Sequence, residues 1–455
     1  MSKKNVTTQG TDLFENAPVP KAVLLNVIPT VISMLMVLVY NLADTFFIGQ
    51  TKNAVMVAAV SIATPAFLLF MAIGMLFGIG GTSMISRRLG ENRGEDAKHA
   101  SSFCFWTGLG IGVISMVLIW IFVNPVCRII GADAETFAYA KQYLQIIAVG
   151  VPFLIISNMF SNIIRSEGEA NTAMIGIVVG NVANIILDPL MILGFGWNVA
   201  GAAAATVVGN ILSTAVYLYH LIGKSKILSI KLKDYKARQG IALGVLAIGI
   251  PASLNSVLMS SSNIVVNNFM IKYGNMAVAG LGVAMKVNMI VVMLLIGIGT
   301  GIQPLLGYNY GARNRKRFKN ILQFAILLTV IVGVVMTIIC FVGSSVLVRA
   351  FLSNHKAYMF GIQFVHILMM TGPVLGILFV LINTIQAMGA ALPSLILSVS
   401  RQGIIYLPVL CILNAVCSSA KMLVFAQPIG DVASILLAFL LFLYSYKKTD
   451  WERKA

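Results

Sequence analysis

The sequence predicts an all-α membrane protein with twelve transmembrane helices, arranged as two six-helix bundles that repeat one another in the same orientation. Three observations support this prediction. Of the 455 residues, 58% are hydrophobic and only 10% are charged, a composition outside the range of soluble domains. Apolar stretches of membrane-spanning length recur along the chain, and the second half of the chain repeats the first at a fixed offset.

The apolar stretches predict the individual helices. A transmembrane helix needs about 20 apolar residues, and stretches of about that length or more alternate with charged or Gly-, Asn- and Pro-containing breaks. In the first half they are 22–48, 57–85, 100–128, 138–164, 171–195 and 200–222. In the second half they are 241–271, 278–306, 321–349, 358–388, 393–418 and 428–446.

These spans divide the chain into five segments. We expect a cytoplasmic tail at 1–20, a first lobe of helices 1–6 at 21–222, a basic cytoplasmic linker at 223–240, a second lobe of helices 7–12 at 241–446, and a cytoplasmic tail at 447–455. The polar start of the chain meets the first apolar stretch without a small-residue cleavage site. That stretch is therefore predicted to be a retained helix rather than a signal peptide.

The net charge of +17 reflects membrane topology rather than binding to nucleic acid, because of where the charges fall. With both termini in the cytoplasm, 23 of the 32 Lys and Arg residues lie in cytoplasmic segments and only seven in outer ones. Positive residues favour the cytoplasmic side, so this is the predicted orientation, in a bacterial inner membrane. No aromatic residues interleave the basic loops, and we expect those loops to contact anionic lipid.

An internal repeat relates the two halves. Sliding the chain on itself by 221 residues aligns 57–93 with 278–314 without a gap. The same offset pairs Pro152 with Pro373, Asn162 with Asn383 and Gly168 with Gly389. Because six is an even number of crossings, the two copies have the same orientation, as in the parallel repeats of secondary transporters. We expect a cavity between the two halves.

The sequence lacks the motifs of covalent chemistry and of nucleotide hydrolysis. It contains no phosphate loop, no nucleophile elbow and no metal-binding His pair. The cysteines lie scattered in apolar stretches, without the spacing of a metal site or a disulfide framework; they are Cys104, Cys127, Cys340, Cys411 and Cys417. We therefore expect no enzyme and no cofactor, and a transport process driven by an ion gradient.

Two acidic residues lie inside the predicted spans. Of the fifteen Asp and Glu residues, thirteen, including Asp431, fall in tails, loops or helix ends, which leaves Asp44 and Asp188. An ionisable group within a membrane helix is costly and marks a functional site by default. Both lie near the outer ends of their helices, so we expect the carboxylates at one depth. Alternatively, Asp44 caps the first helix, and Asp188 hydrogen-bonds a helix broken at Pro189.

Three polar side chains are predicted at the same depth as this pair of acids. Asn184 lies one turn before Asp188 on the same helix face, while Thr206 follows in helix 6 and Tyr143 lies in helix 4. Oxygen ligands of this kind suit Na⁺, and two close carboxylates would also let one of them carry a proton. Both ions are consistent with the sequence.

Further candidates lie in the remaining helices. Lys286 and Arg401 are predicted to be the buried cations of the second half, which either snorkel toward an interface or face a cavity that accepts anionic groups. Asn162 and Met34 are candidates for the cavity lining, since thioethers adapt to varied apolar shapes. His366 can titrate near neutral pH, but a lone histidine in a bundle more often bonds a neighbouring helix.

Three segments carry a resemblance that covers nearly the whole chain. They are 41–49 (NLADTFFIG), 184–206, which begins NIILDPLMI and ends GAAAAT, and 299–312 (GTGIQPLLGYNYGA). These motifs resemble the multidrug and toxic compound extrusion (MATE) family, most of all its DinF- and MepA-like bacterial branch. The resemblance implies a V-shaped pair of six-helix bundles that alternates between outward and inward states. It also implies export of bulky, often cationic compounds in exchange for Na⁺ or H⁺.

The resemblance also implies roles for individual residues. By motif position, Asp44, Asn184, Asp188 and Thr206 would form the cation-coupling site of the first lobe, able to hold Na⁺, and Tyr143 would line the same cavity. Two departures bear on the rest of the chain. The segment 165–174 lacks the proline often found after the family's Arg-x-x-Gly, and helix 7 carries no acid where other branches have one. The resemblance therefore gives no support to ion coupling in the second lobe.

Other functions remain open on the sequence alone. One is a flippase for a lipid-linked saccharide, in which Lys286 and Arg401 would meet pyrophosphate. A membrane enzyme would need acidic metal-binding clusters at a membrane face, which the acids do not supply. A channel fits less well, because alternating access explains duplicated halves with one acid-bearing lobe better. As partners we expect small organic cations or drugs and membrane lipid, no nucleic acid, and a monomeric protein.

Overall fold

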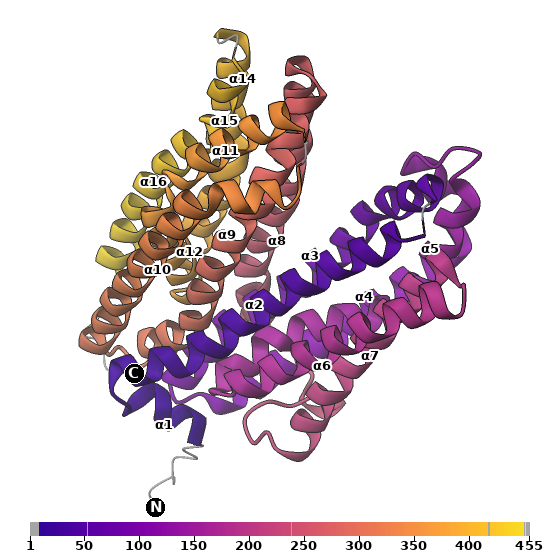
Figure 1. Ribbon diagram of the computed structural model, residues 1–455. Helices are drawn as coiled ribbons and strands as arrows, with labels where there is room; N and C mark the ends of the chain where they lie inside the picture. The colour runs from indigo at the N-terminus through magenta and orange to yellow at the C-terminus, as the bar shows by residue number, and fades with distance from the viewer. Residues whose placement is uncertain are drawn as a thin grey trace, which may run out of the picture. The chain divides into compact units, whose positions relative to one another are not determined.

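Long helices make up almost all of the described chain in the computed structural model (Figure 1). The structure describes residues 9–51, 53–237, 239–352, 354–416, 419–449 and 451, and no β-strand occurs among them. Several residues used in the sequence predictions fall outside this description: Lys3, Lys4, Lys52, Arg238, Cys417, Asp450, Glu452, Arg453 and Lys454.

The chain divides into two units. Unit 1 is the chain up to Asn16 together with Ile32–Gly249, and unit 2 is Ala17–Val31 together with Ile250–Ala455. The predicted lobe bounds, 21–222 and 241–446, follow the sequence repeat and differ from these units in the first helix of each half.

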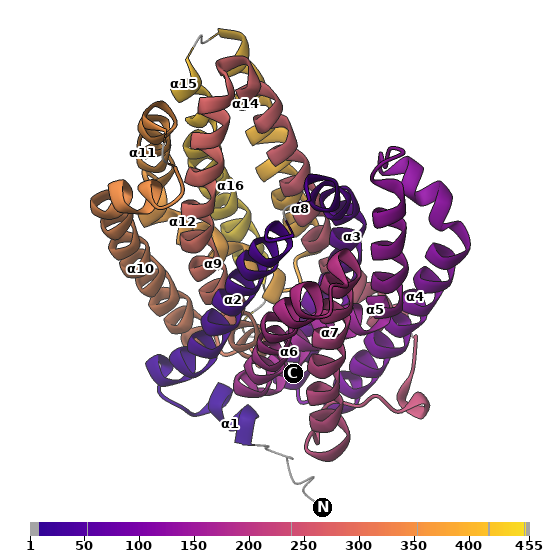
Figure 2. The same cartoon turned by 45° about the vertical axis from the view of Figure 1, so that its right-hand side comes forward.

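Unit 1 is built around one central helix. Its elements are α1 (Gln9–Glu15), the later part of α2 (Val19–Gly49), α3 (Ala54–Gly90), α4 (Gly94–Ile129), α5 (Phe137–Ile163), η1 (Ile164–Glu167), α6 (Ala170–Pro189), η2 (Leu190–Gly194), α7 (Asn198–Gly223), η3 (Leu232–Asp234) and the start of α8 (Gln239–Met270). Helix α5 packs against α3, α4 and α7, and α6 packs against α7. Figure 2 shows these helices from a second side.

Unit 2 repeats this arrangement. Besides the start of α2 and the rest of α8, it contains η4 (Ile271–Tyr273), α9 (Asn275–Gly311), α10 (Arg315–Arg349), α11 (His355–Met369), α12 (Gly372–Ala387), α13 (Ala391–Val399), η5 (Ser400–Tyr406), α14 (Leu407–Val416), α15 (Ala420–Val424) and α16 (Ala426–Lys448). Helix α12 packs against α9, α10 and α16, as α5 packs against α3, α4 and α7.

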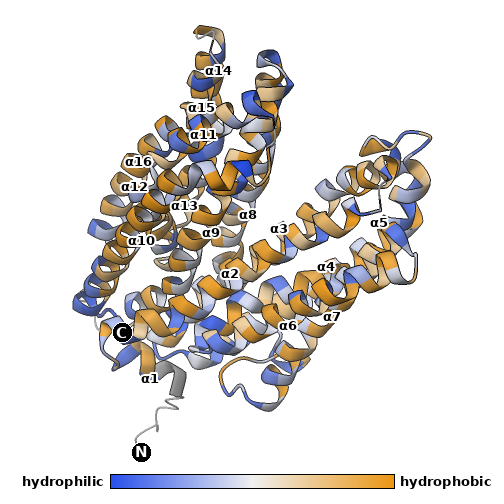
Figure 3. Ribbon diagram, viewed as in Figure 1, coloured by the Kyte–Doolittle hydropathy of each residue, from blue (hydrophilic) through white to orange (hydrophobic). Residues whose placement is uncertain are grey.

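The helices have membrane-spanning length and composition. Eleven helical spans in the described chain are long and apolar enough to cross a membrane, and the pair α11–α12 makes a twelfth if it is counted as one span. This confirms the twelve predicted spans and the all-α fold class. Figure 3 shows hydrophobic residues along most of each helix and hydrophilic residues toward the helix ends and loops. Apolar residues occur around these helices because one side meets other helices and another side meets lipid.

The backbone repeats at the predicted offset of 221 residues. Gly168 and Gly389 both have positive φ, 90° and 70°, a conformation that glycine adopts without a steric penalty. Asn92 and Arg313, also 221 positions apart, both lie in the left-handed region, at φ values of 58° and 56°. Asn92 follows the end of α3, and Arg313 follows the end of α9. The duplication therefore extends from the sequence to the turn geometry.

The two copies differ where a proline enters the central helix. Pro152 lies inside the continuous helix α5, whereas Pro373 begins α12, which is bent by 52° from α11. Proline removes one backbone donor and disfavours helical geometry in the preceding residue. In unit 2 that preceding residue is Gly372, which gives the backbone more freedom to bend than Val151 in unit 1.

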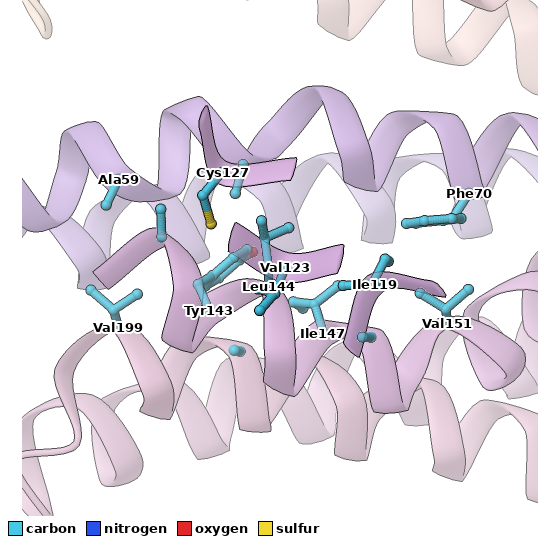
Figure 4. Packing of buried hydrophobic residues seen from close by; sticks show 14 of the residues in the cluster. Ala59, Phe70, Ile119, Val123, Cys127, Tyr143, Leu144, Ile147, Val151 and Val199 are labelled. Carbon is cyan, nitrogen blue, oxygen red and sulfur yellow. The ribbon is translucent and has the colours of Figure 1, made fainter. Parts of the chain in front are cut away.

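Buried apolar side chains hold the outer part of unit 1 together. Figure 4 shows Tyr143 of α5 among residues of a cluster drawn from α3, α4, α5 and α7, including Val123, Cys127, Leu144 and Val199. The cluster places the α5 residue Tyr143 next to α7, the helix that carries Thr206. Cys104, Cys127 and Cys340 are buried, whereas Cys411 is exposed.

The connection between the halves is held against α4. The Trp106 indole donates to the Ile230 carbonyl at 3.0 Å, and the Ser102 hydroxyl donates to the Lys231 carbonyl at 2.8 Å. The ring of Tyr235 stacks on Phe103 with ring centroids 6.0 Å apart. Between α7 and α8 the described residues form only the short helix η3, and the cytoplasmic linker at 223–240 stays a prediction.

Candidate cation site

The candidate site in unit 1 forms where helix α6 changes its winding. The helix runs to Pro189 and continues as the π-helical turn η2. Proline cannot donate a hydrogen bond within a helix, and single π-helical turns are frequent at functional sites. Asp188 directly precedes this proline, so its side chain projects from the point at which regular winding ends.

Asn184, Asp188 and Thr206 come together as predicted. All three are buried, and the exposed fraction of the Asp188 side chain is zero. In the amide orientation that satisfies its neighbours, Asn184 donates to Asp188 Oδ2 at 2.9 Å. The amide oxygen then accepts from the Thr206 hydroxyl at 3.3 Å and from the Thr206 backbone N–H at 3.0 Å. Helix α7 thereby fixes the Asn184 amide, and the amide in turn orients the Asp188 carboxylate.

Asp188 is only half satisfied. Its Oδ1 is buried and accepts no hydrogen bond from the described residues. Asp44 on α2 is half-buried and lies close enough to Asp188 for a direct electrostatic interaction. Among the described Lys, Arg and His side chains, none forms an ion pair with either acid. A buried carboxylate needs a compensating charge or a proton, so this pair is suited to take up a cation.

Two tyrosines complete the surroundings of the acids. Tyr143, predicted from the sequence, is buried and interacts electrostatically with Asp44 and Asp188. Tyr40 was missed by the sequence analysis, although it lies one turn before Asp44 on the same face of α2. It interacts electrostatically with Asp44 and Asp188 and hydrogen-bonds the Thr206 side chain. The spacing of four residues before an intramembrane acid is the signal that could have identified it.

This arrangement can bind either of two cations. The carboxylates, the Asn184 amide oxygen and the hydroxyls of Thr206 and Tyr40 are hard oxygen donors of the kind that suits Na⁺. Two neighbouring carboxylates also favour the binding of one proton, because like charges at short range oppose double ionisation. In the orientation above the Asn184 nitrogen faces Asp188, so the amide would have to turn before its oxygen could join Asp188 around a sodium ion.

Two other predicted residues of unit 1 lie apart from this cluster. Asn162 is on α5, 19 residues after Tyr143, which places it about 28 Å further along the helix. There its Nδ2 donates to the Asn158 carbonyl at 2.9 Å, and its Oδ1 accepts from Arg165 at 3.2 Å. Met34 is half-buried on α2, ten residues or about 15 Å from Asp44. Their roles in a cavity lining remain predictions.

The second half departs from the sequence predictions in two ways. Lys286 is exposed in unit 2, with its ammonium 5.7 Å from the Phe351 ring, so the expectation of a buried cation is wrong at this position. Hydrophobic periodicity did not reveal that this position of α9 is exposed. Arg401 is buried as expected, with an exposed fraction of 5%.

The acidic residues of unit 2 correct a second expectation. Asp431 was assigned to a helix end, but it lies inside the span that ends with α16 and is 3% exposed. The reason is that α16 begins earlier than predicted, at Ala426, and follows α15 directly. Asp431 is therefore a further buried acid within the described spans, in addition to Asp44 and Asp188.

The duplicated bundles and the uncompensated buried acids define a polytopic membrane protein of the transporter class. The protein-family model described as MatE matches residues 29–190 and 251–412. The chain therefore belongs to the MatE family of membrane transporters.

Curated relatives extend the match along almost the whole chain. The chain is 31% identical over 432 residues to the "Multidrug export protein MepA" of Staphylococcus saprophyticus, with 94% of this chain and 95% of the relative covered. It is 30% identical over 431 residues to the protein of the same name from Staphylococcus aureus, with the same coverage. Both matches confirm the predicted MepA-like branch.

Solved structures match the fold. A structure described as MATE in complex with MaL6 has a TM-score of 0.91 at 24% identity and covers 97% of this chain and 99% of its own. A transporter of the MOP superfamily from Pyrococcus furiosus, whose description notes a reversed polarity of its binding pocket, has a TM-score of 0.89 at 25% identity. It covers 97% of this chain and 98% of its own. The fold is therefore that of MATE transporters.

Proposed function

We propose that this protein exports bulky, often cationic organic compounds across a bacterial cytoplasmic membrane, in exchange for Na⁺ or H⁺. The relatives at 30% and 31% identity are named multidrug export proteins, which supports a multidrug substrate range. The observation that carries the ion coupling is the buried Asp188 with the half-buried Asp44 beside it, a pair that has no ion-pair partner among the described basic residues. We further propose a monomer with both termini in the cytoplasm.

Coupling depends on the charge of the Asp44 and Asp188 pair, which differs between the ion-bound and the ion-free protein. When the cation is bound, one negative charge of the acid pair is cancelled, so α2 can pack against α6 and α7 at a lower electrostatic cost. When the cation leaves, the negative charge must be solvated or paired again. Substrate export then requires that the ion-bound state binds the substrate less tightly in the outward conformation. Such exchange is a coupling free energy between two ligands of the same protein.

The direct test is ethidium efflux from proteoliposomes that contain the purified protein, with Na⁺ and pH gradients imposed separately. We expect one of the two gradients to drive efflux and Asp44→Asn to abolish it while the protein still inserts. If neither gradient drives efflux, export by ion exchange is wrong.

A flippase for a lipid-linked saccharide is the second candidate, and the structure weakens it. That function assigned Lys286 and Arg401 to a pyrophosphate group. The charge of Arg401 is already opposed by Asp431 at 3.9 Å, which leaves only the exposed Lys286 of the two cations for the pyrophosphate group.

A further inference from the structure

The buried charges of unit 2 form a compact centre between η5 and α16. Arg401 Nη2 lies 3.9 Å from Asp431 Oδ1, and both side chains are almost completely buried. One turn before Asp431, the Gln427 amide donates to the same oxygen at 3.0 Å. The guanidinium carbon also lies 4.9 Å from the centre of the Phe379 ring, a favourable arrangement for a cation. Arg401 Nε has no hydrogen-bond partner in the described chain.

This centre lies beside the repeat equivalent of the cation site and shares one position with it. The offset of 221 residues places Gln427 where unit 1 has Thr206, and Asp431 where unit 1 has Asn210. Asn210 lies one turn after Thr206, and its amide donates to the Thr206 carbonyl at 2.9 Å. In unit 2, Asp431 therefore lies one helical turn after Gln427, the counterpart of Thr206 in the candidate cation site.

The helices differ in spacing at this level. In unit 1 the Gly209 backbone touches Gly180, so that a Cβ on Gly209 would lie 2.7 Å from the Gly180 carbonyl oxygen. The offset places Gly430 and Arg401 at these two positions in unit 2. A Cβ on Gly430 would make only an ordinary contact, 3.5 Å from the Tyr406 ring. The π-helical winding of η5 accompanies this looser packing, and the Arg401 side chain takes the space that backbone contact closes in unit 1.

We propose that Arg401 is a tethered cation that neutralises Asp431 beside the second unit's counterpart of the cation site, and that Asp431 binds a cation, Na⁺ or H⁺, once the guanidinium is removed. This inference rests on the proposed function. A buried carboxylate requires a cation. The acids of unit 1 must bind a cation from solution, whereas in unit 2 the Arg401 side chain is the cation that compensates Asp431. Because a side chain cannot leave, unit 2 contributes no ion to the exchange.

The first test needs only the unchanged full-length protein. Dicyclohexylcarbodiimide reacts with protonated carboxyl groups in apolar surroundings, and peptide mapping by mass spectrometry locates the modified residues. We expect label at Asp44 or Asp188 and none at Asp431, because an ion-paired carboxylate stays ionised. Label at Asp431 in the unchanged protein would overturn the inference. Absence of label at Asp44 and Asp188 would instead count against the proposed function, and the Arg401 variants below would still decide the inference.

The second test removes the tethered charge. In Arg401→Ala we expect labelling of Asp431 to rise at least about tenfold, which corresponds to one unit in the proton-binding equilibrium. Na⁺ or a higher pH should suppress the labelling, and Tyr406 is the other titratable side chain that interacts with Asp431. Arg401→Lys is the matched control, because it keeps a cation and should leave Asp431 unlabelled. If Arg401→Ala does not fold, Arg401→Gln takes its place. Unlabelled Asp431 in a folded, uncharged variant contradicts the inference.

Discussion

In unit 1 the acids Asp44 and Asp188 have no ion-pair partner among the described basic residues, whereas in unit 2 the buried acid Asp431 lies 3.9 Å from the Arg401 guanidinium. The two units derive from one duplicated sequence and share their turn geometry at Gly168 and Gly389. The difference shows how one copy of a repeat can keep a site for an exchangeable ion while the other neutralises its charge internally. Four experiments on variants test this account.

The largest effect is expected at Asp188. We predict that Asp188→Asn reduces ethidium efflux from cells to the level of cells without the protein, because the amide can neither bind a proton nor supply a charged ligand. Efflux is followed by fluorescence, and membrane insertion by immunoblotting of the membrane fraction. Glu135→Gln is the control, since it makes the same chemical change at an exposed acid. Normal efflux in Asp188→Asn would remove unit 1 from ion coupling.

The next largest effect is expected on the stability of unit 2. Removing one partner of a buried ion pair leaves an uncompensated charge and typically costs about 3–5 kcal/mol. We predict a lowered melting temperature in detergent for Arg401→Met and for Asp431→Asn alone. The double variant Arg401→Met with Asp431→Asn should recover much of the loss, because neither charge remains. A loss in the double variant equal to the sum of the two single-variant losses would show that the two charges do not interact.

A smaller effect is expected at the glycines where the helices approach. Gly209→Ala should destabilise unit 1 by about 1–3 kcal/mol through overpacking, because the new methyl group meets the Gly180 carbonyl at 2.7 Å. Gly430→Ala, the equivalent change in unit 2, should be close to neutral, since the nearest atom is 3.5 Å away. Thermal unfolding of the two variants gives the comparison. An equal loss in both would mean that the helices are spaced alike.

The smallest effect concerns an acid outside the membrane spans. A hydrogen bond from the Ser229 hydroxyl, 2.6 Å away, lowers the pKa of Asp234. A lowered pKa in the folded state stabilises the protein above the unfolded value, about 4, and this contribution is lost as the pH falls through the folded value. Ser229→Ala should therefore lower the melting temperature slightly at pH 7 and not at pH 3. A loss of the same size at both pH values would assign the effect to packing.

Much of the fold and part of the site could be predicted from the sequence. The spans follow from apolar length alone, and Asp188, Asn184 and Thr206 were placed together because helical spacing and depth fix their relative positions. Tyr40 follows the same rule but was overlooked. Asp431 was misplaced because the start of a membrane helix depends on how α15 and α16 pack, which apolar length does not encode. The exposure of Lys286 depends on which face of α9 meets its neighbours, and this also requires tertiary structure.

The most direct test of the account is ion movement driven by substrate. Proteoliposomes loaded with a pH-sensitive dye, or supplied with ²²Na⁺, receive an ethidium gradient, and the ion flux in the opposite direction is recorded. The account predicts that the double variant Arg401→Met with Asp431→Asn retains this flux and that Asp188→Asn loses it. Retained flux in Asp188→Asn, together with lost flux in a folded double variant, would place ion coupling in unit 2 and contradict the account.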